Sequence, residues 1–192
     1  FGMKIPKAYG GLGLSQTNYN RVISLLGSTC GATTVWLSAH QSIGAPQPLM
    51  LFGTDEQKRR YLPRLAQGTI SAFALTERGV GSDPANMLTT AAPIEGGEAF
   101  LLNGEKLWCT NGPVAEVVVV MARTPPVSVR GKERKQITAF IVERSMPGFE
   151  VVHRCDFMGL KGIQNGVLRF TNVRVPTANI LWGPGLGLKL AL

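Results

Sequence analysis

Two short segments of the chain combine residue types that could hold a phosphate-bearing or aromatic ligand. The first reads FALTERGVGSD, from Phe73 to Asp83, and follows a segment with the composition of a strand. Gly79 and Gly81 allow a ligand to approach the backbone closely, and exposed N–H groups beside the Ser82 hydroxyl can bind a phosphate. By itself the pattern is more often an ordinary turn. It also lacks the GxGxxG spacing and the βαβ context of a dinucleotide-binding fingerprint.

The second segment reads WCTNG, from Trp108 to Gly112. Trp108 and Thr110 stand two residues apart at the end of a predicted strand, so their side chains are expected on the same face. A flat ring could then rest on the Trp108 indole while the Thr110 hydroxyl donates a hydrogen bond to its edge. Cys109 is expected to point away from such a ring and to be inert. Taken alone, a core tryptophan followed by a turn threonine is the simpler interpretation.

The elements that must position these segments are strands. From Ile70 onward, short runs rich in Val, Ile, Phe and Thr alternate with turn residues, which is typical of antiparallel strands. We expect strands at 71–76, 88–94, 98–108, 116–123, 136–144, 149–153 and 166–175. Gly96-Gly97 is expected to form the turn between the second and third strands, and Asn103-Gly104 a bulge or turn within the third. The unbroken apolar run 117–120 is expected to be buried on both faces. This pattern predicts a small antiparallel β-barrel or sandwich.

The first third of the chain is predicted to be helical. Apolar periodicity and capping residues indicate helices over 15–27, 33–43 and 54–68. Ser15 is expected to cap the first helix, and Thr54-Asp55-Glu56-Gln57 has the spacing of a capping box at the start of the third. Pro63 is expected to shorten or bend the third helix.

The composition is that of a soluble globular protein. The chain has 192 residues, of which 44% are hydrophobic and 17% charged. No apolar run is long enough for a transmembrane helix. Its 3 cysteines and 2 histidines provide neither a disulfide framework nor a metal signature, so a reducing compartment and no metal site are expected.

The net charge of +8 suits a ligand with several phosphates. Much of the excess gathers in the stretch 123–135, which contains prolines and is expected to be a solvated loop. A nucleic-acid-binding domain is an alternative that rests on this charge alone, because no nucleic-acid motif is present and aromatic residues do not alternate with the basic ones.

Several motifs, taken in order, resemble the acyl-CoA dehydrogenase family. FALTERGVGSD followed by NGEKLWCTNG resembles the paired signatures of that family. Five further segments of this chain resemble other segments of the family: IPKAYGGLGL, AHQSIG, LFGTDEQKRRYLPRLAQG, ITAFIVER and MGLKGIQNGVLRFTNVRVPTANIL. The resemblance covers essentially all 192 residues. Within the family, AHQSIG and ITAFIVER lean toward the very-long-chain branch.

The resemblance implies a multidomain α+β fold. A helical N-terminal domain is expected over 1–70, a β middle domain that binds flavin and acyl-CoA over 71–178, and the start of a C-terminal helical domain over 179–192. The chain begins without an initiator Met and ends in an apolar helical pattern. It is therefore expected to be a piece of a longer protein whose C-terminal helical bundle is missing here.

The family uses FAD as its cofactor. Carried over position by position, the expected cofactor-binding residues are Phe73, Leu75, Thr76, Gly81, Ser82, Trp108 and Thr110. Trp108 would lie against the isoalloxazine ring, Thr110 would form a hydrogen bond near its N5 edge, and Ser82 would also contact the acyl-CoA. Two positions depart from the family pattern. Arg78 stands where a proline is usual, and Cys109 stands where an aliphatic or small residue is usual.

The implied reaction is the α,β-dehydrogenation of acyl-CoA thioesters in fatty acid β-oxidation, in which a carboxylate takes the α-proton and flavin N5 takes the β-hydride. The catalytic glutamate of the family lies in the C-terminal helical domain. We therefore expect the general base beyond Leu192 and little activity from this piece alone. Glu77 is not nominated as the base, because its family counterpart has no such role and a strand would turn it away from Thr76. His40 is expected to pack or cap, and His153 to be exposed.

Two further functions remain open. One is an acyl-CoA oxidase, in which oxygen reoxidises the flavin, and the other is a non-catalytic module that binds acyl-CoA or FAD. The expected partners are acyl-CoA and an electron-transferring flavoprotein, and the full-length protein is expected to be a homo-oligomer that binds no nucleic acid. The expected location is the mitochondrial matrix or inner membrane in a eukaryote, or the cytoplasm in a bacterium, and not outside the cell.

Overall fold

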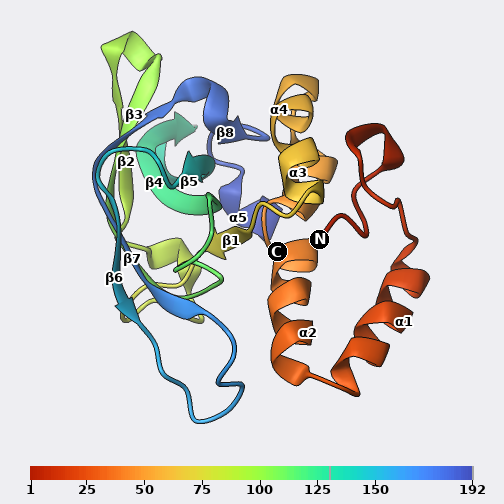
Figure 1. The fold of residues 1–192 in the computed structure, drawn as a ribbon. Coiled ribbons are helices and arrows are strands. Elements are labelled where there is room, and N and C mark those ends of the chain that lie inside the picture. The colour runs from red at the N-terminus through yellow and green to blue at the C-terminus, as the bar shows by residue number, and fades with distance from the viewer. Residues whose placement is uncertain (130, 192) are drawn as a thin grey trace.

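The computed structural model describes residues 1–129 and 131–191, which form a helical part followed by a β part (Figure 1). The helices are α1 (Gln16–Gly27), α2 (Gly31–Ser38), a π-helix (Ala39–Ile43), α3 (Pro46–Phe52), α4 (Asp55–Ala66) and α5 (Gly187–Ala191). The strands are β1 (Ser71–Ala74), β2 (Thr90–Ile94), β3 (Ala99–Thr110), β4 (Val117–Val129), β5 (Lys132–Glu143), β6 (Phe149–Arg154), β7 (Asn165–Pro176) and β8 (Ile180–Leu181). This order confirms the predicted fold class.

The helical part matches its sequence signals at the caps and differs from them in three places, the first being that Pro63 does not shorten the third helix. The Ser15 hydroxyl accepts a hydrogen bond from the Asn18 N–H at 3.3 Å, and both bonds of the capping box at Thr54 are present. Helix α4 continues through Pro63 to Ala66. The second expected helix changes from α to π geometry after Ser38, and α3 was not predicted.

The strands form one eight-stranded sheet in the order β6-β7-β3-β2-β4-β5-β8, with β1 paired to β4. Most neighbours are antiparallel, but β1 and β4 run parallel, and β2 meets β4 in parallel at Thr90 and Arg123. The prediction of a purely antiparallel sheet is therefore wrong at these pairs. The β2–β3 hairpin lies between β1 and β4 in sequence, and a connection of that length allows β4 to return parallel to β1. The described strands do not close into a barrel, so of the two predicted forms the sandwich is the better description.

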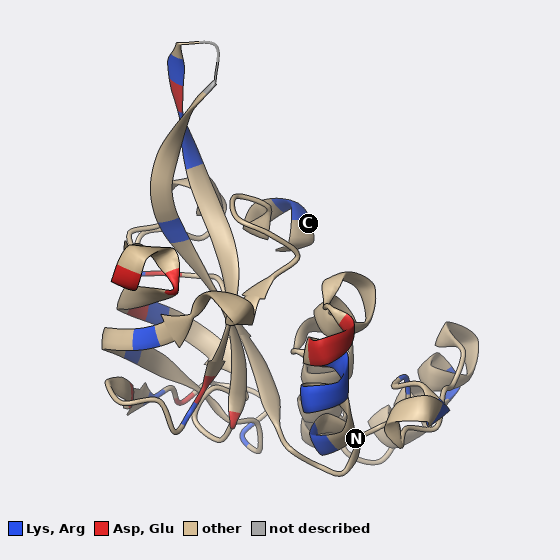
Figure 2. Ribbon diagram, turned by 90° about the horizontal axis from the view of Figure 1, so that it is seen from above, with Lys and Arg blue, Asp and Glu red and all other residues tan. Residues whose placement is uncertain are grey.

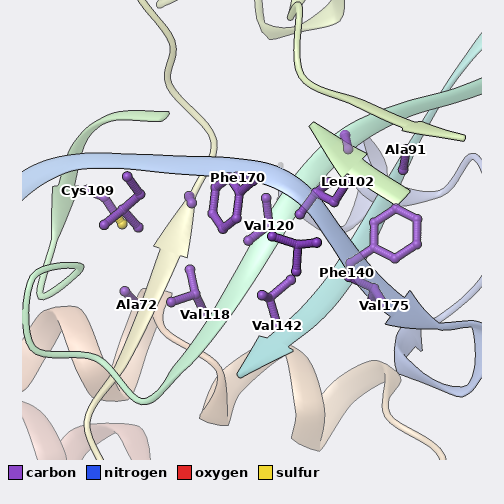
Figure 3. Close-up of a cluster of buried hydrophobic side chains, with 14 of the residues drawn as sticks. Ala72, Ala91, Leu102, Cys109, Val118, Val120, Phe140, Val142, Phe170 and Val175 are labelled. Atoms are coloured by element: carbon purple, nitrogen blue, oxygen red, sulfur yellow. The ribbon is translucent and has the colours of Figure 1, made fainter. Parts of the chain in front are cut away.

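Two hydrophobic clusters make up the core. The first lies between the part of the sheet that contains β3 and β7 and the part that contains β4 and β5. Figure 3 shows Leu102 and Phe170 of the former facing Val120, Phe140 and Val142 of the latter. The second joins the opposite face of β4 and β5 to helices α3 and α4. Strand β4 contributes to both clusters, which confirms the prediction that 117–120 is buried on both faces.

The basic stretch 123–135 was expected to be a loop, and this expectation is wrong. Strands β4 and β5 continue through most of it as a long hairpin, which projects from the body of the molecule in Figure 2. Pro125 and Pro126 fall at a register irregularity between Thr124 and Val127, where a ladder hydrogen bond is not required of them. Arg130, also part of the expected loop, lies outside the described residues.

Three smaller predictions concern strand irregularities and termini. The turn at Gly96-Gly97 and a bulge between Leu102 and Gly104 are both present. Strand β1 ends at Ala74, two residues earlier than expected. Within the described residues, no helix is long and apolar enough to cross a membrane.

Candidate functional site

A cavity of about 320 Å³ lies where the helical part meets the β part. Its helical wall comes from α1, α2 and the π-helix, and its other wall comes from β1 and the end of β3. The lining residues are Ile23, Thr34, Val35, Ser38, Ala39, Ile43, Phe73, Trp108 and Thr110. The two walls therefore combine small and apolar side chains with one indole and a few hydroxyl groups. Such a cavity suits a ligand that is mostly apolar and has a few polar atoms.

The Trp108 ring is presented to this cavity by an irregularity in β3. The register with β7 shifts between Lys106 and Cys109, and Trp108 has a backbone φ of 54°. Its side chain is 58% exposed, whereas Cys109 lies in the core. Burial raises the pKa of the Cys109 thiol to about 12, which agrees with the expected inert role. Trp108 and Thr110 line the same cavity, as expected, although the strand is not regular there.

Buried amide groups hold the end of β3 in place. Asn165, at the start of β7, donates from Nδ2 to the Trp108 carbonyl oxygen at 3.2 Å and to the Thr110 hydroxyl at 3.0 Å. Asn111 donates from Nδ2 to the Trp36 carbonyl oxygen of α2 at 3.0 Å. The bond from Asn111, the residue after β3, joins the end of the strand that carries Trp108 directly to the helix that forms the opposite wall.

The π-helix wall is anchored to β1 through His40. Its Nδ1 accepts from the Ser71 N–H at 3.2 Å and lies 2.9 Å from the Ser71 hydroxyl. The Ser71 N–H can only donate a hydrogen bond, so Nδ1 of His40 must accept it and carries no proton. His40 is therefore neutral, with its proton on Nε2. Burial lowers the pKa of His40 to about 4. The expected packing role is therefore confirmed, and the π-helix is a local departure of the kind often found beside functional sites.

The structure brings together three of the seven residues expected to bind the cofactor. Phe73, Trp108 and Thr110 line the cavity. Leu75 and Thr76 lie just beyond it, in the segment after β1, where the Thr76 carbonyl accepts from the Leu107 N–H at 2.8 Å. The other two, Gly81 and Ser82, lie in an exposed turn outside the cavity lining.

The turn that contains Gly79 is closed by two backbone hydrogen bonds between Glu77 and Val80. Gly79 has a φ of 78°, a value that favours glycine. A Cβ atom added at Gly79 or Gly81 would meet no atom of the described residues within 4 Å, so packing within that part of the chain requires neither glycine. The turn therefore presents open backbone to a ligand.

Sequence reasoning missed a buried ion pair beneath this turn. Lys106 Nζ lies 2.7 Å from Glu77 Oε1, and it also donates to the Leu75 carbonyl oxygen at 3.2 Å. Glu77 follows β1 instead of lying on it, so the expected strand alternation relative to Thr76 does not apply. From sequence alone, a lysine in the middle of a strand that alternates apolar and polar residues is interpreted as solvent-exposed. The one available signal was that Glu77 and Lys106 each belong to one of the two paired family motifs.

Sequence reasoning also missed the helical wall of the cavity, because the spacing within α2 does not indicate which of its faces meets β1. A larger cavity, of about 520 Å³, lies at the base of the β4–β5 hairpin. It is lined in part by Arg123, Glu133 and Lys135 and contains none of the expected cofactor residues. The smaller cavity is the better candidate because it collects the residues that were singled out for chemistry.

Models of two protein families match the chain. The N-terminal domain of acyl-CoA dehydrogenases matches residues 1–69, and the middle domain of acyl-CoA dehydrogenases matches residues 72–173. A probable acyl-CoA dehydrogenase, FadE10 of Mycobacterium tuberculosis, is 55% identical over 192 residues, which is 100% of this chain and 29% of the relative. The human mitochondrial very long-chain specific acyl-CoA dehydrogenase is 41% identical over 194 residues, covering 100% of this chain and 30% of the relative.

A solved structure gives the same comparison in three dimensions. An acyl-CoA dehydrogenase of Bacillus anthracis, complexed with FAD, superposes with a TM-score of 0.89 at 35% identity, covering 99% of this chain and 31% of that chain. The chain thus spans less than a third of the length of these relatives.

Proposed function

The chain belongs to the acyl-CoA dehydrogenase family, in which it spans the N-terminal and middle domains, and from this premise we propose that its full-length protein is a FAD-dependent acyl-CoA dehydrogenase of fatty acid β-oxidation. The observation that carries the proposal is the cavity between α2 and β3, where an exposed indole, a hydroxyl and an apolar wall converge.

The residues of the cavity fit a flavin ring. The Trp108 indole is 58% exposed although it lies at the mouth of a largely apolar cavity, so a flat aromatic ligand stacked on it would cover that surface. Phe73 lines the same cavity from β1, and Thr110 supplies a hydroxyl. We propose that these three residues, together with the backbone of Leu75 and Thr76, hold the isoalloxazine ring.

The exposed turn is proposed to hold the phosphate-bearing parts of the ligands. Gly81 and Ser82 offer open backbone and an exposed hydroxyl there, and the exposed Arg78 adds a positive charge. Ser82 is proposed to contact the acyl-CoA. The acyl chain would extend along the small and apolar side chains of α2 and the π-helix, chiefly Val35 and Ala39.

In the proposed reaction, FAD when bound supplies the hydride acceptor. The described residues bind and orient, since the cavity walls align the acyl chain and exclude water. Glu77 is not available to take the α-proton, because it is buried and paired with Lys106. The general base is therefore proposed to lie in the rest of the full-length protein, and the piece 1–192 is proposed to be inactive alone.

The proposed partners are acyl-CoA as substrate and an electron-transferring flavoprotein as electron acceptor. The full-length protein is proposed to be a homo-oligomer of the very-long-chain branch. Its location is proposed to be mitochondrial if its source is a eukaryote and cytoplasmic if it is a bacterium. One of the matched relatives is mitochondrial and another is bacterial.

The test uses the full-length protein reconstituted with FAD under anaerobic conditions. A saturated long-chain acyl-CoA is expected to bleach the flavin absorbance. Trp108→Ala is expected to weaken FAD binding about tenfold, because an aromatic stacking contact is lost. Trp182→Ala is the control, since Trp182 is also partly exposed but stacks on Phe52 outside the cavity.

Three outcomes would change the proposal. If FAD binds but acyl-CoA does not bleach it, the non-catalytic binding module is favoured. If oxygen that is admitted after the anaerobic reduction reoxidises the bleached flavin rapidly, the protein is an acyl-CoA oxidase. If the flavin spectrum is not perturbed by the wild-type protein at all, FAD binding in this cavity is contradicted.

A further inference from the structure

One buried amide reaches both of the residues that form the ligand-facing end of β3. Asn165 is the first residue of β7, pairs with Thr110 in the β3–β7 ladder, and is 5% exposed. Its Nδ2 lies 3.2 Å from the Trp108 carbonyl oxygen and 3.0 Å from the Thr110 hydroxyl oxygen. The same amide therefore restrains the backbone at the indole and the side chain of Thr110.

The orientation of this amide is fixed by its partners. A carbonyl oxygen can only accept a hydrogen bond, so the NH₂ group of Asn165, and not its oxygen, must face Trp108. The second N–H of that group is directed to Thr110 Oγ1, which consequently acts as an acceptor.

The hydroxyl of Thr110 has one hydrogen, and its oxygen already accepts from Asn165. Across residues 1–129 and 131–191, no protein acceptor takes that hydrogen, and Thr110 lines the cavity. Thr110 is therefore prepared to donate a hydrogen bond to a ligand and is less able to accept one.

We infer that Asn165 is a positioning residue that biases the Thr110 hydroxyl toward donating a hydrogen bond, and that it thereby favours the oxidised over the reduced form of a flavin bound on Trp108. The inference rests on the proposed function. In an oxidised isoalloxazine ring, N5 is an unprotonated nitrogen that accepts a hydrogen bond. In the two-electron-reduced ring, N5 carries a hydrogen and donates. A hydroxyl whose oxygen already accepts from Asn165 matches the first form better than the second, because only one of its two lone pairs is left to accept.

Removal of the Asn165 amide would free the hydroxyl to rotate. Thr110 could then donate to the oxidised ring or accept from the reduced ring, so the preference for the oxidised form should fall. The midpoint potential of the bound flavin should rise accordingly, because reduction is favoured when the reduced form binds relatively more tightly.

The experiment measures the dissociation constants of oxidised and reduced FAD from the full-length protein. In Asn165→Leu, which is nearly isosteric and excludes water, the ratio of the two constants is expected to shift about three- to tenfold toward reduced FAD, the range for one net hydrogen bond. A tenfold shift corresponds to about 30 mV for a two-electron couple. Asn165→Ala provides a second variant if Asn165→Leu does not fold.

Two further variants separate positioning from a merely structural role. In the Thr110→Val background, Asn165→Leu is expected to leave the ratio unchanged, because the hydroxyl that it would release is absent. Asn179→Leu is the matched control. Asn179 is another buried amide, and it donates to the Ile141 carbonyl oxygen at 2.7 Å, away from the cavity lining. It is expected to leave the ratio unchanged whatever its effect on stability.

The inference is overturned if Asn165→Leu weakens the binding of both flavin forms equally, or if its effect on the ratio persists in the Thr110→Val background. Either result would show that the amide only shapes the strand. Failure of the proposed function is seen separately, because the wild-type protein would then bind neither form of FAD.

Discussion

At the scale of single residues, the Glu77–Lys106 pair links the turn after β1 to the strand that carries Trp108. Lys106 is fully buried, and Glu77 also accepts from the N–H groups of Leu88 and Thr89. Burial raises the pKa of the Glu77 carboxyl, but the hydrogen bonds from Lys106, Thr89 and Leu88 outweigh it, so the pKa lies below its usual value. The Glu77 carboxylate therefore remains charged, and its oxygens are engaged in these hydrogen bonds.

Lys106→Met is expected to destabilise the full-length protein by about 3 kcal/mol, because it leaves the Glu77 carboxylate buried without its cation. Adding Glu77→Gln to this variant should restore part of the loss, since a neutral amide oxygen can still accept from Thr89. Urea unfolding of the two variants and the wild type measures both changes.

The control for this prediction is the exposed pair formed by Glu105 and Arg169, at 3.1 Å. Glu105→Gln is expected to cost less than about 1 kcal/mol, because solvent screens surface ion pairs. Equal losses for Lys106→Met and Glu105→Gln would show that burial gives the Glu77–Lys106 pair no special weight.

At this scale the sequence identified part of the site. Phe73, Trp108 and Thr110 were reached through motif resemblance, and the structure places them around one cavity. Lys106 and Asn165 were not identified, because the importance of each depends on a partner from a distant segment. Only the three-dimensional pairing of β3 with β7, and of β3 with the turn after β1, shows those partners.

At the scale of elements, the start of α4 is fixed by a capping box that also anchors the helix to the sheet. The Thr54 hydroxyl accepts from the Gln57 N–H at 3.1 Å, and the Gln57 side chain accepts from the Thr54 N–H at 3.1 Å. The Gln57 amide nitrogen further donates at 2.8 Å to the carbonyl oxygens of Ala178 and Ile180, which lie at the entry to β8.

Thr54→Ala is expected to cost about 1 kcal/mol, the usual value of an N-cap. Gln57→Ala should cost more, about 2 kcal/mol, because two carbonyl oxygens of the β part also lose their donor. Urea unfolding of the full-length variants measures the difference. Ser15→Ala, at an exposed cap with a single 3.3 Å bond, is the control and should cost the least. A Gln57→Ala loss no larger than that of Thr54→Ala would mean that the bonds to Ala178 and Ile180 contribute nothing.

Elements with local signals were predicted well from sequence, and those without were not. The caps at Ser15 and Thr54 and the turn at Gly96-Gly97 depend on neighbouring residues only. Helix α3 was missed because its seven residues include two prolines and show no clear period. The outer part of the β4–β5 hairpin was missed because its polar, exposed residues have a loop-like composition, and the parallel pairing of β1 with β4 has no local signature at all.

At the scale of the whole molecule, Figure 2 shows basic bands on α4 and along the projecting hairpin. On α4 this charge clamps the helical part to the β part. Arg60 and Arg64 reach the Glu143 carboxylate of β5 at 2.7 and 3.0 Å, and the Tyr61 hydroxyl donates to it at 3.2 Å. The Glu143 side chain is 14% exposed, whereas the side chains of Arg60 and Arg64 are 58% and 40% exposed.

This clamp predicts a specific sensitivity to acid. Burial raises the pKa of Glu143, but the hydrogen bond from Arg64 and the charges of Arg64 and Arg60 outweigh it, so the pKa in the folded protein is lowered. A depressed folded pKa gives stabilisation that is fully present above the unfolded pKa, about 4.3, and is lost as the pH falls through the folded value. The unfolding free energy should therefore decline as the pH is lowered from about 5 to values below the unfolded pKa, where Glu77 contributes in the same direction.

Glu143→Gln is expected to cost about 1 kcal/mol at pH 7, a value kept small by the exposure of the two arginines, and to make the decline in acid shallower. Urea unfolding of the full-length protein at several pH values measures both effects. Glu150→Gln, on the exposed side of β6, is the control, and both the stability and its pH dependence should stay as in the wild type. If the unfolding free energy of Glu143→Gln fell with decreasing pH as steeply as that of the wild type, the clamp would not contribute to the coupling between the helical and β parts.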